Sequence, residues 1–181
     1  MADSADSDEA LMRRYALGDV AAFDTLYRRH EMRVWRYLER NTGNRATADE
    51  LMQEVWFAVA RDAGRYVPSA RFTTWLFTIA HHRMIDSVRT RRRERSLDAE
   101  ELIADPGSGP LAAAISTDQA KAVLAAVSQL PEEQRDAFLL QIEGDLGVEE
   151  IAAITACSFE TTKSRLRYAR TKLRELLREH V

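Results

Sequence analysis

A stripe of basic side chains near the C-terminus is the strongest chemical pattern in the sequence. Its members recur every three or four residues, the spacing that places side chains on one face of a helix: Lys163, Arg167, Arg170 and Arg174. Cationic groups arranged in this way contact the phosphates of nucleic acid, and Arg can hold a phosphate with two hydrogen bonds. A charged face that only meets solvent is the alternative interpretation, because amphipathic basic helices are common.

The segment around this stripe has the proportions of a helix-turn-helix motif. A short helix over 148–155 precedes the turn Ala156-Cys157-Ser158, and a long helix follows over 159–178. Ser158 can cap the long helix, whereas Ala156 stands where such turns usually have Gly and would be strained in a left-handed conformation. The polar side chains of the long helix are the candidates for contacts with duplex DNA: Thr161, Lys163, Ser164, Arg165, Arg167, Tyr168 and Arg170.

A second basic cluster, at 89–95, ends a helix that we expect to start near Thr73-Thr74. Aromatic residues beside such a basic face suit single-stranded bases, on which they can stack. Trp75 fits a hydrophobic core equally well. His82 and Asp86 are one helical turn apart, but no further ligand pair lies nearby, so we expect no metal site.

A helix over 48–63 is predicted to carry an acidic surface. Two pairs spaced by four residues lie beside its apolar positions: Asp49 with Gln53, and Glu50 with Glu54. Such a face could bind a protein, or its acids could simply suit the helix N-terminus. Thr47 is the predicted N-cap of this helix.

Length and composition exclude several classes of protein. The chain has 181 residues, 45% of them apolar, which allows one domain or two small ones. No apolar run is long enough for a transmembrane helix, and the acidic first ten residues do not resemble a signal peptide. A single Cys suits a reducing compartment, so we expect a cytoplasmic protein. No nucleophile, phosphate-loop or paired-carboxylate motif indicates an enzyme.

Charge divides the chain into blocks. Residues 65–95 carry eight basic and two acidic side chains, 96–150 carry two and twelve, and 151–181 carry seven and three. The net charge of the whole chain is −3, so the protein by itself should bind DNA weakly. Helical spacing dominates on both sides of a Pro- and Gly-containing acidic stretch. We therefore predict an all-α protein with two small helical domains, 1–95 and 114–181, joined by a flexible acidic linker over 96–113.

Taken together, these segments resemble a bacterial RNA polymerase sigma factor of the extracytoplasmic-function (ECF) group of the sigma-70 family. The resemblance covers most of the chain and follows the order of the family's motifs: GDVAAFDTLYRRH, TADELMQEVWFAVAR, RFTTWLFTIAHHRMIDSVRTRRR and LPEEQRDAFLLQIEGDLGVEEIAAI with TTKSRLRYARTKLRELL. It implies that 1–95 is a sigma region 2 helical bundle and that 114–181 is a sigma region 4 helix-turn-helix domain. The function that it implies is to bind core RNA polymerase and direct promoter-specific initiation.

The resemblance also assigns roles to residues. The second domain would read the −35 promoter element through the long-helix residues named above. The first would recognise and melt the −10 element through Trp75, Thr78, His82, Arg83, Arg89, Arg92 and Arg93, although the family often has Asn where His82 stands. The β′ coiled coil would bind Asp49, Glu50, Gln53 and Glu54, and the β flap would also be a partner. An anti-sigma factor is a further partner that the family suggests, and no cofactor is implied.

Two other functions and one regulatory hypothesis stay open at this point. A stand-alone helix-turn-helix regulator would bind its operator tightly without polymerase, and a decoy module would bind a regulatory protein but never DNA. Many relatives have an acidic residue where Thr47 stands. A Ser/Thr kinase could therefore restore the missing charge at Thr47 or a neighbour such as Thr42, and so switch polymerase binding on.

Overall fold

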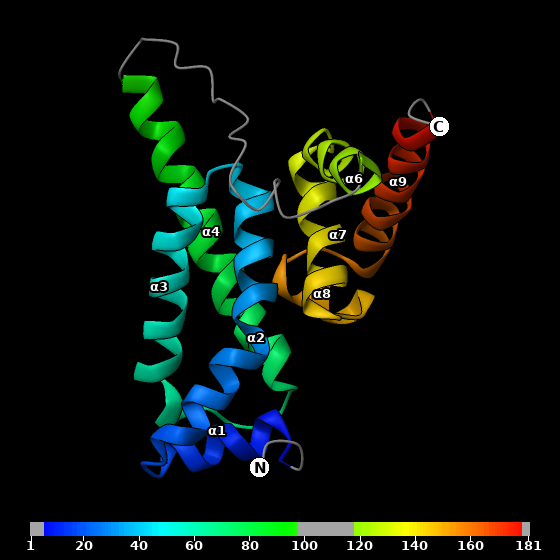
Figure 1. The fold of residues 1–181 in the computed structure, drawn as a ribbon. Coiled ribbons are helices and arrows are strands. Elements are labelled where there is room, and N and C mark those ends of the chain that lie inside the picture. The colour runs from blue at the N-terminus through cyan, green and yellow to red at the C-terminus, as the bar shows by residue number, and fades with distance from the viewer. Residues whose placement is uncertain (1–5, 98–117, 179–181) are drawn as a thin grey trace.

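The computed structural model of the protein describes residues 6–97 and 118–178, where the regular elements are all helices (Figure 1). The helices form two groups. The first consists of α1 (Asp8–Ala16), α2 (Val20–Thr42), α3 (Arg45–Arg61), the 3-10 turn η1 (Ala63–Arg65) and α4 (Phe72–Leu97). The second consists of α6 (Asp118–Ser128), α7 (Glu132–Gly144), α8 (Val148–Ile154) and α9 (Phe159–Arg178). The predicted all-α fold with two helical domains is confirmed, and the linker predicted over 96–113 lies outside the described residues from position 98 onward.

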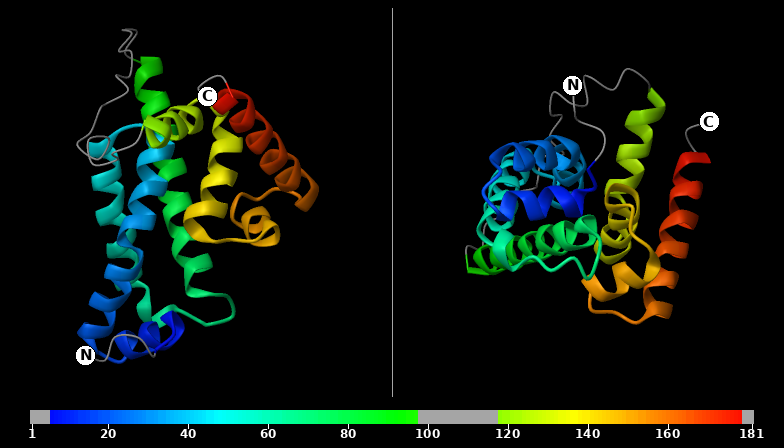
Figure 2. Two further views of the ribbon diagram at one scale, coloured as in Figure 1. Left: turned by 45° about the vertical axis from the view of Figure 1, so that its right-hand side comes forward. Right: turned by 90° about the horizontal axis from the view of Figure 1, so that it is seen from below.

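Three long helices build the first domain. α2, α3 and α4 pack against one another, and Figure 2 shows them side by side in both views. Each helix contributes apolar side chains at helical spacing to a common core: Leu26, Val34 and Leu38 from α2, Leu51, Val55 and Val59 from α3, and Phe72, Leu76 and Ala80 from α4. This packing fixes the outward faces of α3 and α4, which carry the predicted binding residues.

Helix α1 is an element that the sequence analysis did not predict. Ser7 caps it by accepting a hydrogen bond from the backbone N–H of Ala10, and Leu11 and Met12 bury its apolar side. Glu9 reaches across to the start of α4, where its Oε1 accepts the N–H of Phe72 at 2.8 Å. This hydrogen bond lowers the pKa of the Glu9 carboxyl. α1 therefore supports the first turn of α4.

The predicted N-cap of α3 was wrong. Asn44 is the N-cap, and its Oδ1 accepts the backbone N–H of Thr47 at 3.0 Å. Gly43, directly before it, has φ 63° and ends α2, a conformation that suits Gly. Thr47 lies in the first turn of α3 and is only 2% exposed.

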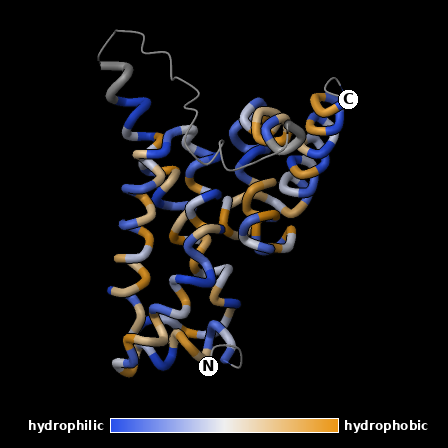
Figure 3. Tube along the Cα trace, in the orientation of Figure 1, coloured by the Kyte–Doolittle hydropathy of each residue, from blue (hydrophilic) through white to orange (hydrophobic). Residues whose placement is uncertain are grey.

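The second domain is a smaller bundle in which α9 packs on α6, α7 and α8. One face of α9 is buried at Thr162, Leu166, Ala169 and Leu173, and α9 packs on α8, which buries Ile151 and Ile154. Figure 3 shows hydrophilic and hydrophobic residues alternating along α9, as expected for a helix with one buried face.

The two domains contact each other directly. α7 packs along α2, and α4 touches both α7 and α8. The helices approach closely at Gly144, where an added Cβ would lie 3.3 Å from Cγ of Phe77 in α4. Within the two described ranges, no helix combines the length and the apolar character needed to span a bilayer.

Candidate nucleic-acid interface

Helix α9 presents most of the predicted DNA-binding side chains to solvent. Ser158 caps it, as predicted, by accepting the backbone N–H of Thr161 at 3.1 Å. Lys163, Arg167 and Arg170 are exposed along one face, which is the stripe identified in the sequence. Tyr168 is 53% exposed, and the Arg167 guanidinium lies 5.0 Å from the centre of its ring. This face has the charge and the access that a recognition helix needs in a DNA groove.

Arg165 is placed differently from the other predicted contacts of α9. Its side chain is 19% exposed, and its Nη2 lies 2.6 Å from the carboxylate of Glu133 in α7. Its Nη1 donates to Sγ of Cys157 at 2.9 Å. Arg165 thus ties the recognition helix to the turn and to α7, a position that favours a structural role over DNA contact.

The turn before α9 is strained at one residue. Ala156 has φ 52°, in the left-handed region that non-glycine residues rarely adopt. The backbone N–H of Cys157 still reaches the carbonyl of Ala152 at 3.0 Å, so the turn keeps its hydrogen bonding. Ala156 therefore adopts the left-handed conformation that Gly usually has in such turns, and the backbone there is strained.

Helix α4 divides the predicted −10 residues between its faces. His82, Arg89 and Arg93 are exposed and Thr78 is half-buried, so these four can form a common polar stripe. Trp75 belongs to an aromatic cluster, with its ring centre 5.1 Å from that of Tyr66 and 6.0 Å from that of Phe72. Because Trp75 is half-buried, its ring packs in this cluster and is also partly accessible to solvent.

Two further arginines of α4 have carboxylate partners in other helices. Arg83 lies 3.8 Å from Glu54 of α3, so it joins the two predicted binding helices of the first domain. Arg92 lies 2.6 Å from Glu132 of α7, which belongs to the second domain. A nucleic-acid contact by Arg92 would have to replace this ion pair.

The acidic face of α3 is on the surface, as its pattern predicted. Asp49, Glu50, Gln53 and Glu54 are all exposed, and Asp49 accepts the indole N–H of Trp35 at 2.7 Å. Phe57, which was not among the residues predicted from the sequence, is 70% exposed on the same face, four residues after Gln53. The neighbouring Trp56 is buried, so Phe57 is the aromatic residue that α3 leaves at the surface here. The face therefore combines negative charge with an exposed aromatic ring at its C-terminal end.

Thr47 is poorly accessible to a modifying enzyme. It is 2% exposed, and its hydroxyl donates to Oδ1 of Asn44 at 3.1 Å. A phosphoryl group at this position requires the first turn of α3 to open. Its placement argues against the phosphorylation hypothesis.

The two adjacent histidines of α4 point to different surroundings. His82 is exposed, whereas His81 is buried with its Nδ1 3.2 Å from Asp136 of α7. Among residues 6–97 and 118–178, no cluster of three or more potential metal ligands is present.

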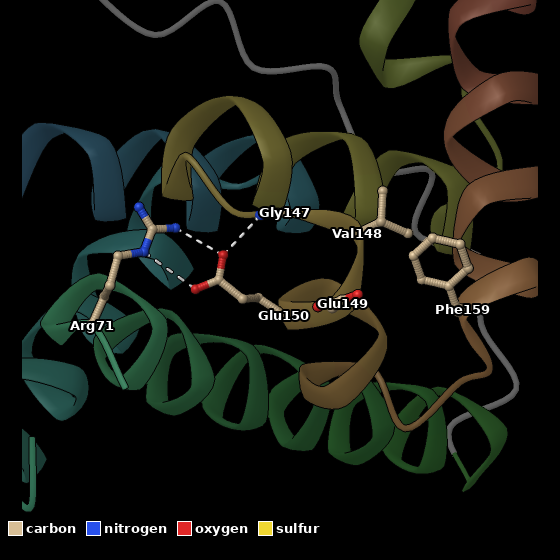
Figure 4. A pocket seen from close by; sticks show the side chains of 6 residues that line it. All are labelled: Arg71, Gly147, Val148, Glu149, Glu150 and Phe159. Atoms are coloured by element: carbon tan, nitrogen blue, oxygen red, sulfur yellow. Dashed lines mark hydrogen bonds and ion pairs between the residues drawn. The ribbon is translucent and has the colours of Figure 1, made fainter. Parts of the chain in front are cut away.

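A pocket of about 460 Å³ opens where the two domains meet (Figure 4). It is lined by Arg71, Gly147, Val148, Glu149, Glu150 and Phe159. The Glu150 carboxylate accepts hydrogen bonds from Arg71 and from the backbone N–H of Gly147, both at 2.8 Å. Burial raises the pKa of Glu150, but the hydrogen bonds from Arg71, Thr74 and Gly147 outweigh it and lower the pKa overall. One wall of the pocket is thus an ion pair between the domains.

Comparison with known families agrees with the division into two helical groups. The family "Sigma-70 region 2" matches residues 26–94, and "Sigma-70, region 4" matches residues 120–173. The chain is 35% identical over 170 residues to the RNA polymerase sigma factor CarQ of Myxococcus xanthus, covering 93% of this chain and 96% of the relative. It is 36% identical to the ECF RNA polymerase sigma factor RpoE of Cereibacter sphaeroides, covering 87% of each chain.

Two solved structures share the fold across both groups of helices. The sigma factor RpoE in complex with the anti-sigma factor NepR, from Bartonella quintana, has a TM-score of 0.71 and 25% identity and covers 80% of this chain and 89% of its own. CnrH in complex with the cytosolic domain of CnrY has a TM-score of 0.69 and 25% identity, with 97% and 100% covered. Both similarities extend beyond either domain alone.

Proposed function

Because the chain belongs to the ECF group of RNA polymerase sigma factors, and so binds core polymerase and directs initiation at specific promoters, we propose which of its surfaces carries each step. The residues of the first domain up to about 95 bind core polymerase and recognise and melt the −10 element. Those from about 114 onward recognise the −35 element. Sigma factors are known as non-enzymatic initiation factors, so we infer that this chain works by binding energy alone, in the bacterial cytoplasm where polymerase is found.

The exposed face of α9 carries the proposal for the −35 element. Lys163, Arg167 and Arg170 would hold phosphates, while Thr161, Ser164 and Tyr168 are in reach of base edges if the N-terminal half of the helix enters the major groove. Arg165 is left out of this set because its guanidinium already has two partners inside the domain.

The outward faces of α3 and α4 carry the proposal for the first domain. The four polar residues of α3 and the exposed Phe57 would dock on the β′ coiled coil of the polymerase, with the ring as an apolar contact beside the acids. Thr78, His82, Arg89 and Arg93 would meet the melted −10 strand, with Arg83 positioned by Glu54. The polymerase holds both domains at a set distance, so two weak DNA contacts act together.

An anti-sigma factor is a proposed regulatory partner, since similar sigma-factor structures were solved in complex with one. A stand-alone regulator would leave the exposed acidic face of α3 without a function. The alternative is therefore not favoured, and a gel shift with the free protein separates the two: the sigma-factor proposal expects weak binding.

The decisive experiment is transcription with purified core polymerase. We expect the protein to co-purify with core and to start transcripts at a defined set of promoters. Lys163→Ala combined with Arg167→Ala should abolish this transcription and reduce the slope of log binding constant against log salt by about 1.8, since each phosphate contact contributes roughly 0.9. Lys172→Ala is the matched control. Lys172 is also on α9, but it lies nine residues after Lys163 and therefore on the opposite side of the helix. Loss of the same size in the control, or tight specific binding without polymerase, would contradict the proposal.

A further inference from the structure

The contact between the two domains centres on a buried carboxylate. Glu143 of α7 is 3% exposed and lies between two arginines of α2. Its Oε2 accepts from Arg36 at 2.9 Å, and its Oε1 accepts from Arg40 at 2.6 Å. Arg36 and Arg40 are one helical turn apart, so their like charges converge on this single acceptor.

A second buried carboxylate lies two turns earlier on the same face of α7. Asp136 is 7% exposed, and its Oδ1 accepts the hydroxyl of Tyr37 at 2.7 Å. Its Oδ2 lies 3.2 Å from Nδ1 of His81 in α4. Burial, with the negative charge of Asp136, raises the pKa of Tyr37 well above its usual range, so the phenol remains a donor.

Two more ion pairs lie at the ends of this contact. Glu132, at the start of α7, meets Arg92 at 2.6 Å. At the other end Glu150 of α8 meets Arg71 at 2.8 Å in the pocket wall of Figure 4. Glu150 also accepts a hydrogen bond from the hydroxyl of Thr74. The second domain thus places a row of four carboxylates on the first domain, which we call the carboxylate row: Glu132, Asp136, Glu143 and Glu150.

The contact between the domains has an apolar part, where Phe77 packs beside Gly144, and a charged part whose nature favours reversible opening. Ion pairs that leave water gain little net free energy, because desolvation offsets most of their attraction. When the domains separate, both sides of the carboxylate row can be hydrated, so only the apolar part of the contact around Phe77 resists opening through the hydrophobic effect. A partner that binds only the separated domains can therefore shift the equilibrium.

The closed arrangement does not fit a promoter. The −35 and −10 elements lie about 25 base pairs apart, which is roughly 85 Å of B-form DNA. In the closed chain α9 packs on α7 and α7 touches α4, so the helices that carry the two DNA-binding faces are about two interhelical distances of 8–10 Å apart. The second domain also holds Arg92 on the helix that should meet the −10 element.

We propose that the free chain is autoinhibited by its own second domain, whose carboxylate row holds the two domains closed until core polymerase separates them. The role of core polymerase in this proposal rests on the proposed function. The closed contact between the two domains is a property of the free chain and can be measured without polymerase. Only open molecules bind polymerase, so the apparent affinity is the intrinsic affinity multiplied by the open fraction. Weakening the ion pairs of the carboxylate row, which we call the lock, should therefore increase the apparent affinity.

The test combines small-angle X-ray scattering of the full chain with titration of core polymerase. Glu143→Gln and the double variant Arg36→Gln/Arg40→Gln weaken the lock from opposite sides. We expect wild type to scatter near the radius of gyration of a compact chain of this length, about 16 Å, and both variants to exceed wild type by about a fifth or more. Apparent affinity for core should rise about 3- to 10-fold in both. Combining the three substitutions should add little, because they remove the same interaction.

The controls remove charges on the same two kinds of side chain at exposed positions outside the contact. Glu175→Gln lies in α9, and Arg28→Gln lies on the exposed side of α2 beside Asp24, so neither should change scattering or core affinity. An extended wild type, or variants with unchanged scattering and affinity, would overturn the proposal. Variants that lose their helical circular dichroism are replaced by Glu150→Gln, at the edge of the contact, with the same expectation. If scattering shows opening but no form of the chain binds core polymerase, the lock exists and the sigma-factor proposal fails instead.

Discussion

The guanidinium of Arg165 lies 2.9 Å from Sγ of Cys157, eight residues earlier in the chain, and holds the recognition helix against its own turn. The same group meets Glu133 at 2.6 Å. A basic residue inside a DNA-reading helix is therefore directed inward, where it has a different role from its exposed neighbours Lys163 and Arg167.

Arg165→Ala should lower the stability of the second domain without removing a phosphate contact. We expect the free energy of unfolding to fall by about 1–3 kcal/mol, because packing and hydrogen bonds are lost together. The salt dependence of promoter binding by the polymerase complex should keep its wild-type slope. Thermal unfolding and salt titrations measure the two effects, and Arg167→Ala should show the reverse pattern. A reduced slope with unchanged stability would return Arg165 to the DNA-binding set.

Ala156→Gly should stabilise the protein. Ala156 has φ 52°, and a left-handed conformation costs a non-glycine residue roughly 1–2 kcal/mol, part of which Gly loses again through its more flexible unfolded state. We expect a net gain of about 1 kcal/mol and a rise in melting temperature of about 2–4 °C. Ala153→Gly, inside α8, is the control and should destabilise by a similar amount. Equal changes in both variants would mean that the turn is not strained.

Much of this architecture could be predicted from sequence because it depends on local patterns. The apolar spacing of α9 and the cap at Ser158 are visible within a few residues. The cap of α3 was misassigned because Asn44 and Thr47 are both good capping residues, and only the backbone path distinguishes them. The partners of Arg165 and Glu143 lie in helices distant in sequence. Nothing in the local pattern distinguishes these charges from solvated ones.

Thr47→Glu should weaken binding to core polymerase. The side chain of Thr47 is buried beside Asn44, so a longer charged group would disturb the first turn of α3, which carries the acidic face. We expect lower stability and a several-fold loss of affinity, while Thr47→Ala stays close to wild type in affinity because its hydroxyl makes only one local hydrogen bond. Titration of core polymerase with the three proteins decides the matter. Tighter binding by Thr47→Glu than by wild type would revive the phosphorylation hypothesis.

Glu9 should make stability depend on pH in the acidic range. The N–H of Phe72 holds the pKa of its carboxyl below the ordinary value of 4.5, so folding favours the ionised form. The stabilisation is therefore fully present above about pH 4.5 and is lost as pH falls through the lower folded-state pKa. Denaturant unfolding of wild type and Glu9→Gln should show a difference in stability at pH 7 that shrinks toward pH 3. A difference that stays constant over this range would show that the carboxylate charge has no part in it.

Phe57 should be a major contributor to polymerase binding that folding does not require. Its ring is 70% exposed at the C-terminal end of the acidic face of α3, and exposed aromatic residues beside polar groups often dominate a protein interface. Phe57→Ser should leave the melting temperature within about 2 °C of wild type, because little buried surface is removed. Affinity for core polymerase should fall about 10- to 100-fold, which corresponds to roughly 1.4–2.8 kcal/mol. Leu17→Ser is the matched control, since Leu17 is 89% exposed at the end of α1 and lies off this face. If both variants bind core as wild type does, the ring of Phe57 is not part of the interface and the four polar residues must carry the contact without it.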